Sequence, residues 1–351
     1  MKKHLCNIHN ISVELVMNNR DRMEKYLEYL SMCIDGFDEY YRDSKTDKVL
    51  LVRDIEELEI PEYAIVVPEN AYYFDGIFYS LEARIAFRMQ KNGMEFWAYE
   101  HAWYLPYILQ LILEDENKTF IHGAGIAVHG EGILISAFGG IGKTCFIANA
   151  VKQENVKLLG DDLIIIRGDG YCYSYPRPFC LYEYHKSLFP QYFEGRKIHY
   201  ETYRANRYFL RIQRHLKIWL NIKDNIVYDY LPVSPIHLFP KEVLQIEKVP
   251  IKKLFVMRRV KGICEISKSK ASDVEKVANF THDVIQHEWS IGIRLEYNYF
   301  AHKEENYALR AVKQYNIIKN AFITIPEIWY VDIPEKMSAE EVSRKLNELI
   351  L

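Results

Sequence analysis

The sequence has few cysteines, no long apolar run and little net charge. Its six cysteines form no CxxC pair, which disfavours both a disulfide framework and a zinc site. The longest apolar stretch, over residues 107–113, is interrupted by Gln110 and is too short to cross a bilayer. No apolar stretch follows the two lysines near the start, so we expect no signal peptide. These absences predict a chain of the reducing cytoplasm with no membrane partner.

The charges nearly cancel, with 45 Lys and Arg against 48 Asp and Glu, which gives a formal net charge of −3. This balance argues against nucleic acid as a partner, so local groups must hold any anionic ligand. The hydrophobic fraction of 49% is enough for a substantial core. A polar break at residues 114–118 predicts two units. These are an N-terminal α/β region of unknown role over 1–115 and a larger unit over 116–351 with a helical C-terminal extension.

Hydrophobic periodicity in the first unit predicts a helix over 23–33 and strands over 48–52 and 63–67. Residues 96–113 are dense in aromatic side chains and predict a buried helix, kinked or restarted at Pro106. The alternative for this segment is a stacking platform for a base, but aromatic-rich apolar stretches usually form core.

The second unit alternates between strand and helix patterns. Ser338 and Glu341 have the spacing of a capping box for its last helix, and Gly168-Asp169-Gly170 predicts a hairpin turn. Strands are expected over 120–122, 132–136, 156–159, 163–167, 171–174, 254–257 and 329–332, and helices over 143–151, 272–286, 306–319 and 339–349.

A glycine-rich loop, Ala137-Phe138-Gly139-Gly140-Ile141-Gly142-Lys143-Thr144, fits the Walker A form with alanine in place of the first glycine. Glycines let the backbone curl and aim its N–H groups at phosphate oxygens, at the start of a helix whose dipole favours an anion. Lys143 reaches the β and γ phosphates in this pattern, and the Thr144 hydroxyl ligates Mg²⁺. The residues expected to bind the nucleotide are Gly139, Gly140, Ile141, Gly142, Lys143, Thr144 and Cys145.

Two adjacent aspartates, Asp161 and Asp162, end the strand that follows the helix opened by the loop. One carboxylate can accept the proton of an attacking hydroxyl while the other holds Mg²⁺, directly or through water. The alternative is an ordinary polar turn between two strands. Beside a phosphate loop, the functional interpretation is favoured.

These features together resemble the HPr kinase/phosphorylase catalytic domain, which shares its fold with ATP-dependent phosphoenolpyruvate carboxykinase. The resemblance lies in His122-Gly123-Ala124-Gly125, in Gly132 to Ser136 leading into the loop, and in Leu158-Leu159-Gly160-Asp161-Asp162. It implies an α/β fold with a P-loop kinase core on a mixed sheet, and phosphate transfer to a serine hydroxyl. It also implies that Asp161 is the general base and Asp162 a metal-side carboxylate. The glycine-bearing second signature of HPr kinases is missing, so a bifunctional regulator of sugar uptake is not expected.

Weaker signals surround this core. His122 is a catalytic candidate by the resemblance, with a buried structural histidine as the alternative. Glu183 is a candidate for a further Mg²⁺ ligand. Two basic groups suit phosphate or carboxylate, although a solvated helix face explains the first of them as well. They are Arg204, Arg207, Arg211 and Arg214 at helical spacing, and Arg258 with Arg259 at a strand end.

The sequence thus predicts a kinase that uses ATP (or ADP) and Mg²⁺ to phosphorylate a hydroxyl, in a serine of a peptide or protein or in a small molecule. A nucleotide-binding sensor without phosphoryl transfer is the alternative from another class. A carboxykinase-like enzyme would share the loop but would need metal-binding histidine or lysine groups that the sequence does not place. Neither NKxD nor an LSGGQ-like signature is present, which disfavours switch GTPases and transport ATPases. The acceptor and the oligomeric state, including a homo-oligomer, stay open.

Overall fold

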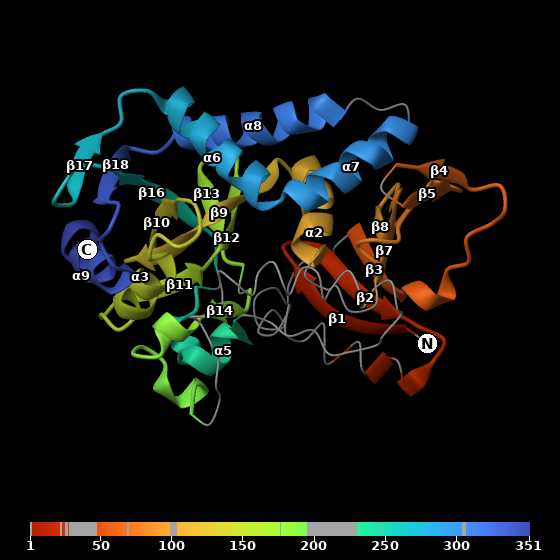
Figure 1. Ribbon diagram of the computed structural model, residues 1–351, viewed down its shortest axis with the longest axis horizontal. Helices are drawn as coiled ribbons and strands as arrows, with labels where there is room; N and C mark the ends of the chain where they lie inside the picture. The colour runs from red at the N-terminus through yellow and green to blue at the C-terminus, as the bar shows by residue number, and fades with distance from the viewer. Residues whose placement is uncertain are drawn as a thin grey trace.

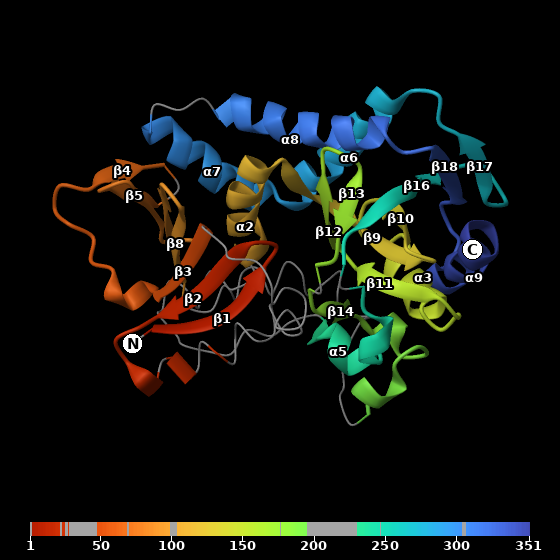
Figure 2. The ribbon, with the colours of Figure 1, turned by 180° about the vertical axis from the view of Figure 1, so that it is seen from behind.

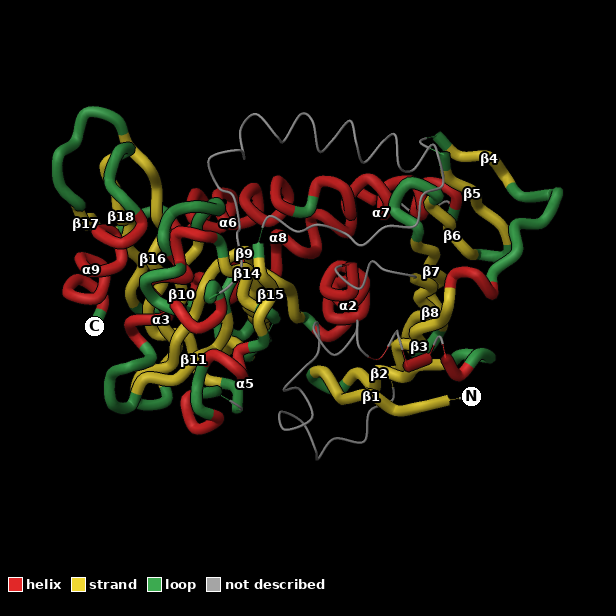
Figure 3. The backbone as a smooth tube through the Cα atoms, turned by 60° about the horizontal axis from the view of Figure 1, so that its bottom comes forward, coloured by secondary structure: helices red, strands yellow, loops and turns green. Residues whose placement is uncertain are grey.

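Two large mixed sheets lie at opposite ends of the computed structural model, and helices α7 (Ser290–His302) and α8 (Tyr307–Ile323) run above both (Figure 1). The structure describes residues 2–21, 23–24, 27, 48–68, 70–98, 104–175, 177–194, 230–245, 247–303 and 307–351. Helix α2 (Leu105–Leu113) lies between the sheets in each of the three views (Figures 1, 2 and 3). The chain therefore has the mixed α/β architecture that its pattern predicts.

The first sheet is formed by residues 2–98, in the order β1-β2-β3-β8-β7-β6-β5-β4. Strand β3 pairs in parallel with β2 and β8, and the remaining neighbours are antiparallel. The strands are β1 (Lys2–Ile8), β2 (Ile11–Val16), β3 (Lys48–Asp54), β4 (Ile65–Val67), β5 (Ala71–Phe74), β6 (Ile77–Ser80), β7 (Ile85–Gln90) and β8 (Gly93–Ala98), with the short helix η2 (Ile55–Glu57) after β3. Strands β3 and β4 confirm the two strands predicted in this region, whereas β1, β2 and β5 to β8 were not predicted.

The prediction of one helix over 96–113 is wrong for its first residues. Phe96 and Trp97 belong to β8, which pairs with β3 and β7 on its two edges, so cross-strand pairing overrides the apparent helical spacing. The helix begins only at Leu105, and Pro106 lies in its first turn, where proline is tolerated because that N–H has no intrahelical partner. Pro106 therefore lies at the start of a helix, which confirms the predicted restart and not the kink. Residues 99–103, and nearly all of the helix predicted over 23–33, lie outside the described residues.

The second sheet has the order β10-β9-β12-β13-β16-β18-β17. Strand β10 also pairs in parallel with β16, so the hydrogen-bonded path from β10 through β9, β12 and β13 to β16 closes on itself. Strands β11 and β12 run in succession along one edge of the long strand β9. The strands are β9 (Lys118–Val128), β10 (Glu131–Ser136), β11 (Val156–Gly160), β12 (Leu163–Arg167), β13 (Tyr171–Tyr173), β16 (Val249–Val260), β17 (Ser267–Lys270) and β18 (Glu327–Pro334).

Helices cover this sheet and join it to the first one. They are α3 (Lys143–Ala150), α6 (Val274–Glu288), α7 (Ser290–His302), α8 (Tyr307–Ile323) and α9 (Ala339–Ile350), with the short elements η4 (Glu114–Glu116), η5 (Glu183–His185), η6 (Pro190–Tyr192), α5 (Pro235–Leu238) and η7 (Lys241–Val243) between them. A separate ribbon pairs β14 (Phe179–Leu181) with β15 (Leu231–Val233). Every strand and helix predicted in this unit is found, but β9 and β16 are much longer than the strands predicted over 120–122 and 254–257, and α7, β14, β15 and β17 were not predicted. Ser338 with Glu341 forms the expected capping box.

Specific contacts tie the first sheet to the rest of the chain. His9 Nε2 lies 2.8 Å from the carbonyl oxygen of Ser174, and the Tyr299 hydroxyl lies 3.1 Å from the amide nitrogen of Met89, which donates to it. None of the described helices is long and apolar enough to cross a membrane.

Candidate functional site

The glycine-rich loop joins β10 to α3, as predicted for a strand, a loop and a helix in succession (Figure 1). Gly140 and Gly142 have φ angles of 74° and 101°, a backbone conformation that favours glycine. Gly142 is also the N-cap of α3, and a Cβ added to it would lie 3.2 Å from the carbonyl oxygen of Ala339. The backbone turns sharply here because glycine permits it, and the N–H groups of the first turn of α3 face the loop.

Lys143 is buried at the start of α3, with 6% of its surface exposed. Its Nζ donates hydrogen bonds to the carbonyl oxygens of Ala137 and Phe138, each 3.1 Å away, and lies 3.1 Å from Nε2 of His122. Burial lowers the pKa of Lys143, against the attraction of Asp162, Asp161 and Glu288. The loop is therefore wrapped around a single ammonium group.

The aspartate pair lies at the break between β11 and β12. The amide of Gly123 on β9 donates to the carbonyl oxygen of Asp162 over 3.1 Å, which fixes the break against the neighbouring strand. Asp162 has a φ of 72°, unusual for a residue with a side chain. This backbone turn places two adjacent carboxylates on the side of the sheet that carries the loop.

Asp161 points toward α3. Its Oδ2 accepts a hydrogen bond of 2.6 Å from the Thr144 hydroxyl, and among the described residues its buried Oδ1 has no hydrogen-bond partner. Burial, with the charge of Asp162 beside it, raises the pKa of Asp161 from 3.8 to about 6, although the bond from Thr144 opposes the shift. A buried carboxylate oxygen with no donor is a natural position for a proton or a cation.

Asp162 faces Arg177 and His122 instead. Arg177 Nη1 donates to Oδ2 of Asp162 over 2.5 Å, and His122 Nδ1 lies 3.5 Å from Oδ1. Burial would raise the pKa of Asp162, but Arg177, His122 and Lys143 together hold it below its usual range. The two neighbouring aspartates thus have pKa values displaced in opposite directions, a pattern found where acid and base roles are divided.

His122 connects Lys143 to Asp162. Burial lowers its pKa from 6.5 to about 4, with Lys143 and Arg177 lowering it and Asp162 opposing them. The ring is therefore neutral at neutral pH, and the tautomer that fits the contacts has Nε2 accepting from Lys143 and the Nδ1 proton facing Asp162. The structure thus brings His122, Lys143, Thr144, Asp161 and Asp162 together.

Two residues of this cluster were not predicted from the sequence. Arg177 lies between β13 and β14, and Glu288 ends α6, two residues beyond the end of the predicted helix. Glu288 Oε1 accepts a 3.3 Å hydrogen bond from the amide of Gly139 and lies 3.9 Å from Nε2 of His122. Glu288 is 149 residues from the glycine it contacts, so no local spacing could have indicated it.

The remaining predicted residues have other surroundings. Ile141 and Cys145 are buried beside the loop, and burial raises the pKa of the Cys145 thiol to about 11. Glu183 is exposed at the start of η5. The described part of the chain contains no group of three or more His, Cys, Asp and Glu side chains able to hold a metal ion.

Only one of the two predicted arginine groups lies among the described residues. Arg258 donates to Asp332 over 2.8 Å, and Arg259 donates to the carbonyl oxygen of Pro334 over 3.0 Å. These contacts join β16 to β18 and to the turn before α9. The spaced arginines Arg204, Arg207, Arg211 and Arg214 lie outside the described residues.

Comparison of the sequence with protein-family models gave no match, and no curated protein is a significant match either. A function is therefore inferred from the residues of the site.

Proposed function

We propose that the chain is a kinase with a P-loop core of the HPr kinase and phosphoenolpyruvate carboxykinase type, which binds ATP (or ADP) with Mg²⁺ and phosphorylates a hydroxyl. The acceptor is a serine of a peptide or protein, or a small molecule. The observation that carries the proposal is the 2.6 Å contact between Thr144 and Asp161. It joins the first turn of the helix after the glycine loop to a buried pair of carboxylates.

The residues present suit a nucleotide and Mg²⁺. The start of α3 offers backbone N–H groups and a positive dipole end, and Lys143 supplies a cation at the same point. On the other side, the Thr144 hydroxyl and the ionised Asp162 would hold the metal. Bound Mg²⁺ would supply charge neutralisation on the phosphates.

Asp161 has the properties of the proton acceptor. A general base is most effective when its pKa lies near the working pH, and burial brings the pKa of Asp161 to about 6. Its Oδ1 takes the proton of the acceptor hydroxyl, whose oxygen forms the new P–O bond. The bond to the leaving phosphate oxygen breaks, and Lys143 stabilises the negative charge left there.

The test is calorimetric titration of ATP and ADP, each with Mg²⁺, into the wild type, Lys143→Ala and Lys152→Ala. Lys152 lies just after α3 and bonds only Asn149 among the described residues, so its variant controls for loss of a lysine. We expect micromolar binding in the wild type and the control, and a loss of about a hundredfold in Lys143→Ala. Absence of binding in the wild type would refute the proposal.

The nucleotide that binds is then incubated with free serine, seryl peptides and other hydroxyl compounds, and products are followed by phosphorus NMR. Transfer to one class of acceptor identifies the substrate. Binding that depends on Lys143, without transfer to any acceptor, would favour the nucleotide sensor instead.

A further inference from the structure

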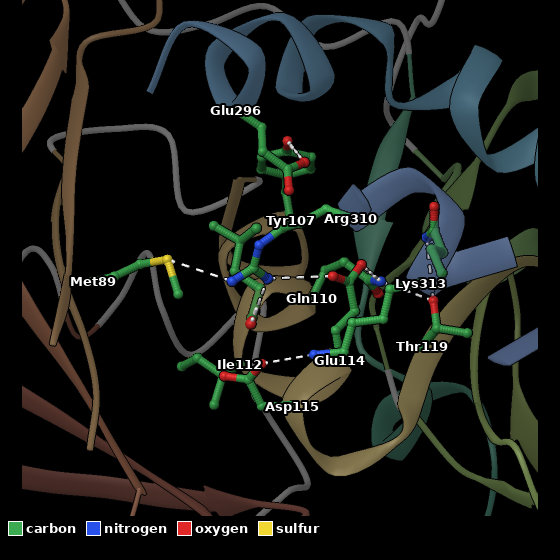
Figure 4. Close-up of polar contacts among 12 residues, drawn as sticks. Met89, Tyr107, Gln110, Ile112, Glu114, Asp115, Thr119, Glu296, Arg310 and Lys313 are labelled. Carbon is green, nitrogen blue, oxygen red and sulfur yellow. Dashed lines mark hydrogen bonds and ion pairs between the residues drawn. The ribbon is translucent and has the colours of Figure 1, made fainter. Parts of the chain in front are cut away.

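A second polar site lies between α2, α7 and α8, away from the glycine loop (Figure 4). It is a pocket of about 270 Å³, counted with its open mouth, and its interior has room for about one group of the size of a water molecule. Its walls include Tyr107, Glu114, Trp289, Glu296 and Arg310. Two buried carboxylates and one guanidinium therefore face a small internal space.

The first carboxylate is fully engaged by protein groups. Gln110 Nε2 donates to Oε1 of Glu114 over 2.6 Å, and Arg310 Nη1 lies 3.3 Å from Oε2 (Figure 4). Arg310 also donates to the carbonyl oxygen of Leu111 over 3.3 Å. The positive charge of Arg310 is thus committed to Glu114, which leaves the second carboxylate without a cation of its own.

That second carboxylate belongs to Glu296, of which 6% is exposed. Its only hydrogen bond among the described residues comes from the Tyr107 hydroxyl, 2.6 Å from Oε2, so Oε1 has no donor. Burial, then the charge of Glu114, raises the pKa of Glu296 to about 7, against the bond from Tyr107 and the charge of Arg310. A largely buried carboxylate with a single hydrogen bond is destabilised as an anion unless a proton or a cation lies beside its open oxygen.

The other groups that line the space are side-chain amides, two aromatic rings and two apolar side chains. Gln286 donates from Nε2 to Oε1 of Gln314 over 2.7 Å, which leaves its own Oε1 without a donor in the described structure. The rings of Tyr107 and Trp289 meet edge to face, with centroids 5.6 Å apart. Carbonyl and carboxylate oxygens beside aromatic rings are the groups that bind ammonium ions in proteins.

We infer that this pocket binds the ammonium group of a small amine, with Glu296 as the counter-ion and the rest of the ligand at the mouth. The size of the interior fits an ammonium head. Trp289, in the wall of the pocket, directly follows Glu288, which contacts the glycine loop. An amine held here therefore uses no residue of the proposed kinase site.

The test uses methylammonium and ethanolamine as probes, with ethanol and sodium chloride as neutral and ionic controls. Calorimetry measures binding to the wild type, to Glu296→Gln and to Glu348→Gln, whose parent side chain is exposed on α9. We expect the amines to bind the wild type and Glu348→Gln alike, and Glu296→Gln at least about tenfold more weakly. Ethanol and sodium should not bind the pocket.

A second measurement needs no variant. Near neutral pH, amine binding to the wild type should release a fraction of a proton, because the cation displaces the proton of Glu296. The release is measured as a binding heat that changes with the ionisation enthalpy of the buffer. Equal binding by wild type and Glu296→Gln, no proton release, or no binding at millimolar amine would each overturn the inference. Lys143→Ala should keep amine binding, so failure of the proposed kinase function would leave this result unchanged.

Discussion

The hydroxyl of Thr144 donates a 2.6 Å hydrogen bond to Oδ2 of Asp161, across 17 residues of chain. Thr144 is fixed by the first turn of α3, and Asp161 by the break between β11 and β12. Their contact places the end of the glycine loop and the aspartate pair in one site.

Thr144→Val keeps the size of the side chain but removes the hydroxyl that would ligate Mg²⁺. We expect the gain in ATP affinity on adding Mg²⁺ to fall about tenfold, which corresponds to about 1.4 kcal/mol. Thr144→Ser should retain the gain. Titrations of ATP in Mg²⁺ and in EDTA measure this gain in affinity. If Thr144→Val gains as much ATP affinity from Mg²⁺ as the wild type does, the hydroxyl has no metal-binding role.

Asp161→Asn removes the proposed base while leaving the shape of the site. Phosphoryl transfer should fall by about 10² to 10⁴-fold, because proton transfer by a positioned side chain contributes about that much. Nucleotide affinity should change little. Asp169→Asn, in the exposed turn between β12 and β13, is the control and should transfer phosphate like the wild type. Full activity in both variants would show that Asp161 is not the base.

Gly142→Ala and Gly130→Ala test the backbone of the loop. Both glycines have a positive φ, 101° and 81°, so each alanine adds strain of about 1–2 kcal/mol. Only at Gly142 does the new Cβ approach another backbone group, the carbonyl oxygen of Ala339, whereas Gly130 is open. Urea denaturation should show Gly142→Ala to be the less stable variant by about 1 kcal/mol. Equal losses would mean that α9 moves freely away from the loop.

Glu296→Gln should change the pH dependence of stability. The pKa of Glu296 is raised from 4.5 to about 7, so the folded state holds this proton more tightly than the unfolded state does. That contribution to the free energy of unfolding is complete below 4.5 and is lost as the pH rises through 7. At about pH 8 the variant should be more stable than the wild type by on the order of 2 kcal/mol. The difference should vanish near pH 4.5.

Thermal denaturation across this pH range measures the effect, with exposed Glu348→Gln as the control. A difference that is independent of pH would show that Glu296 does not titrate in this window.

The sequence by itself determined the local chemistry of the site. Gly140, Gly142, Lys143 and Thr144 were identified because a phosphate loop requires particular residue types at fixed spacing, and this requirement is met within a few residues. The same holds for strands such as β10 to β12, whose apolar runs are bounded by turn residues. The aspartate pair was identified because a strand ends there.

Only the tertiary structure decided which side chains surround that chemistry. Arg177 comes from the segment between β13 and β14 and Glu288 from a helix end, neither with a distinctive spacing, yet they contact Asp162 and the loop. Phe96 and Trp97 form a strand because β3 and β7 supply edges to pair with. The carboxylate of Glu296 faces Tyr107, 189 residues earlier, because α7 packs against α2. Hydrophobic periodicity in the sequence indicates which face of a helix or strand is buried. Packing between distant elements decides which side chains that face contacts.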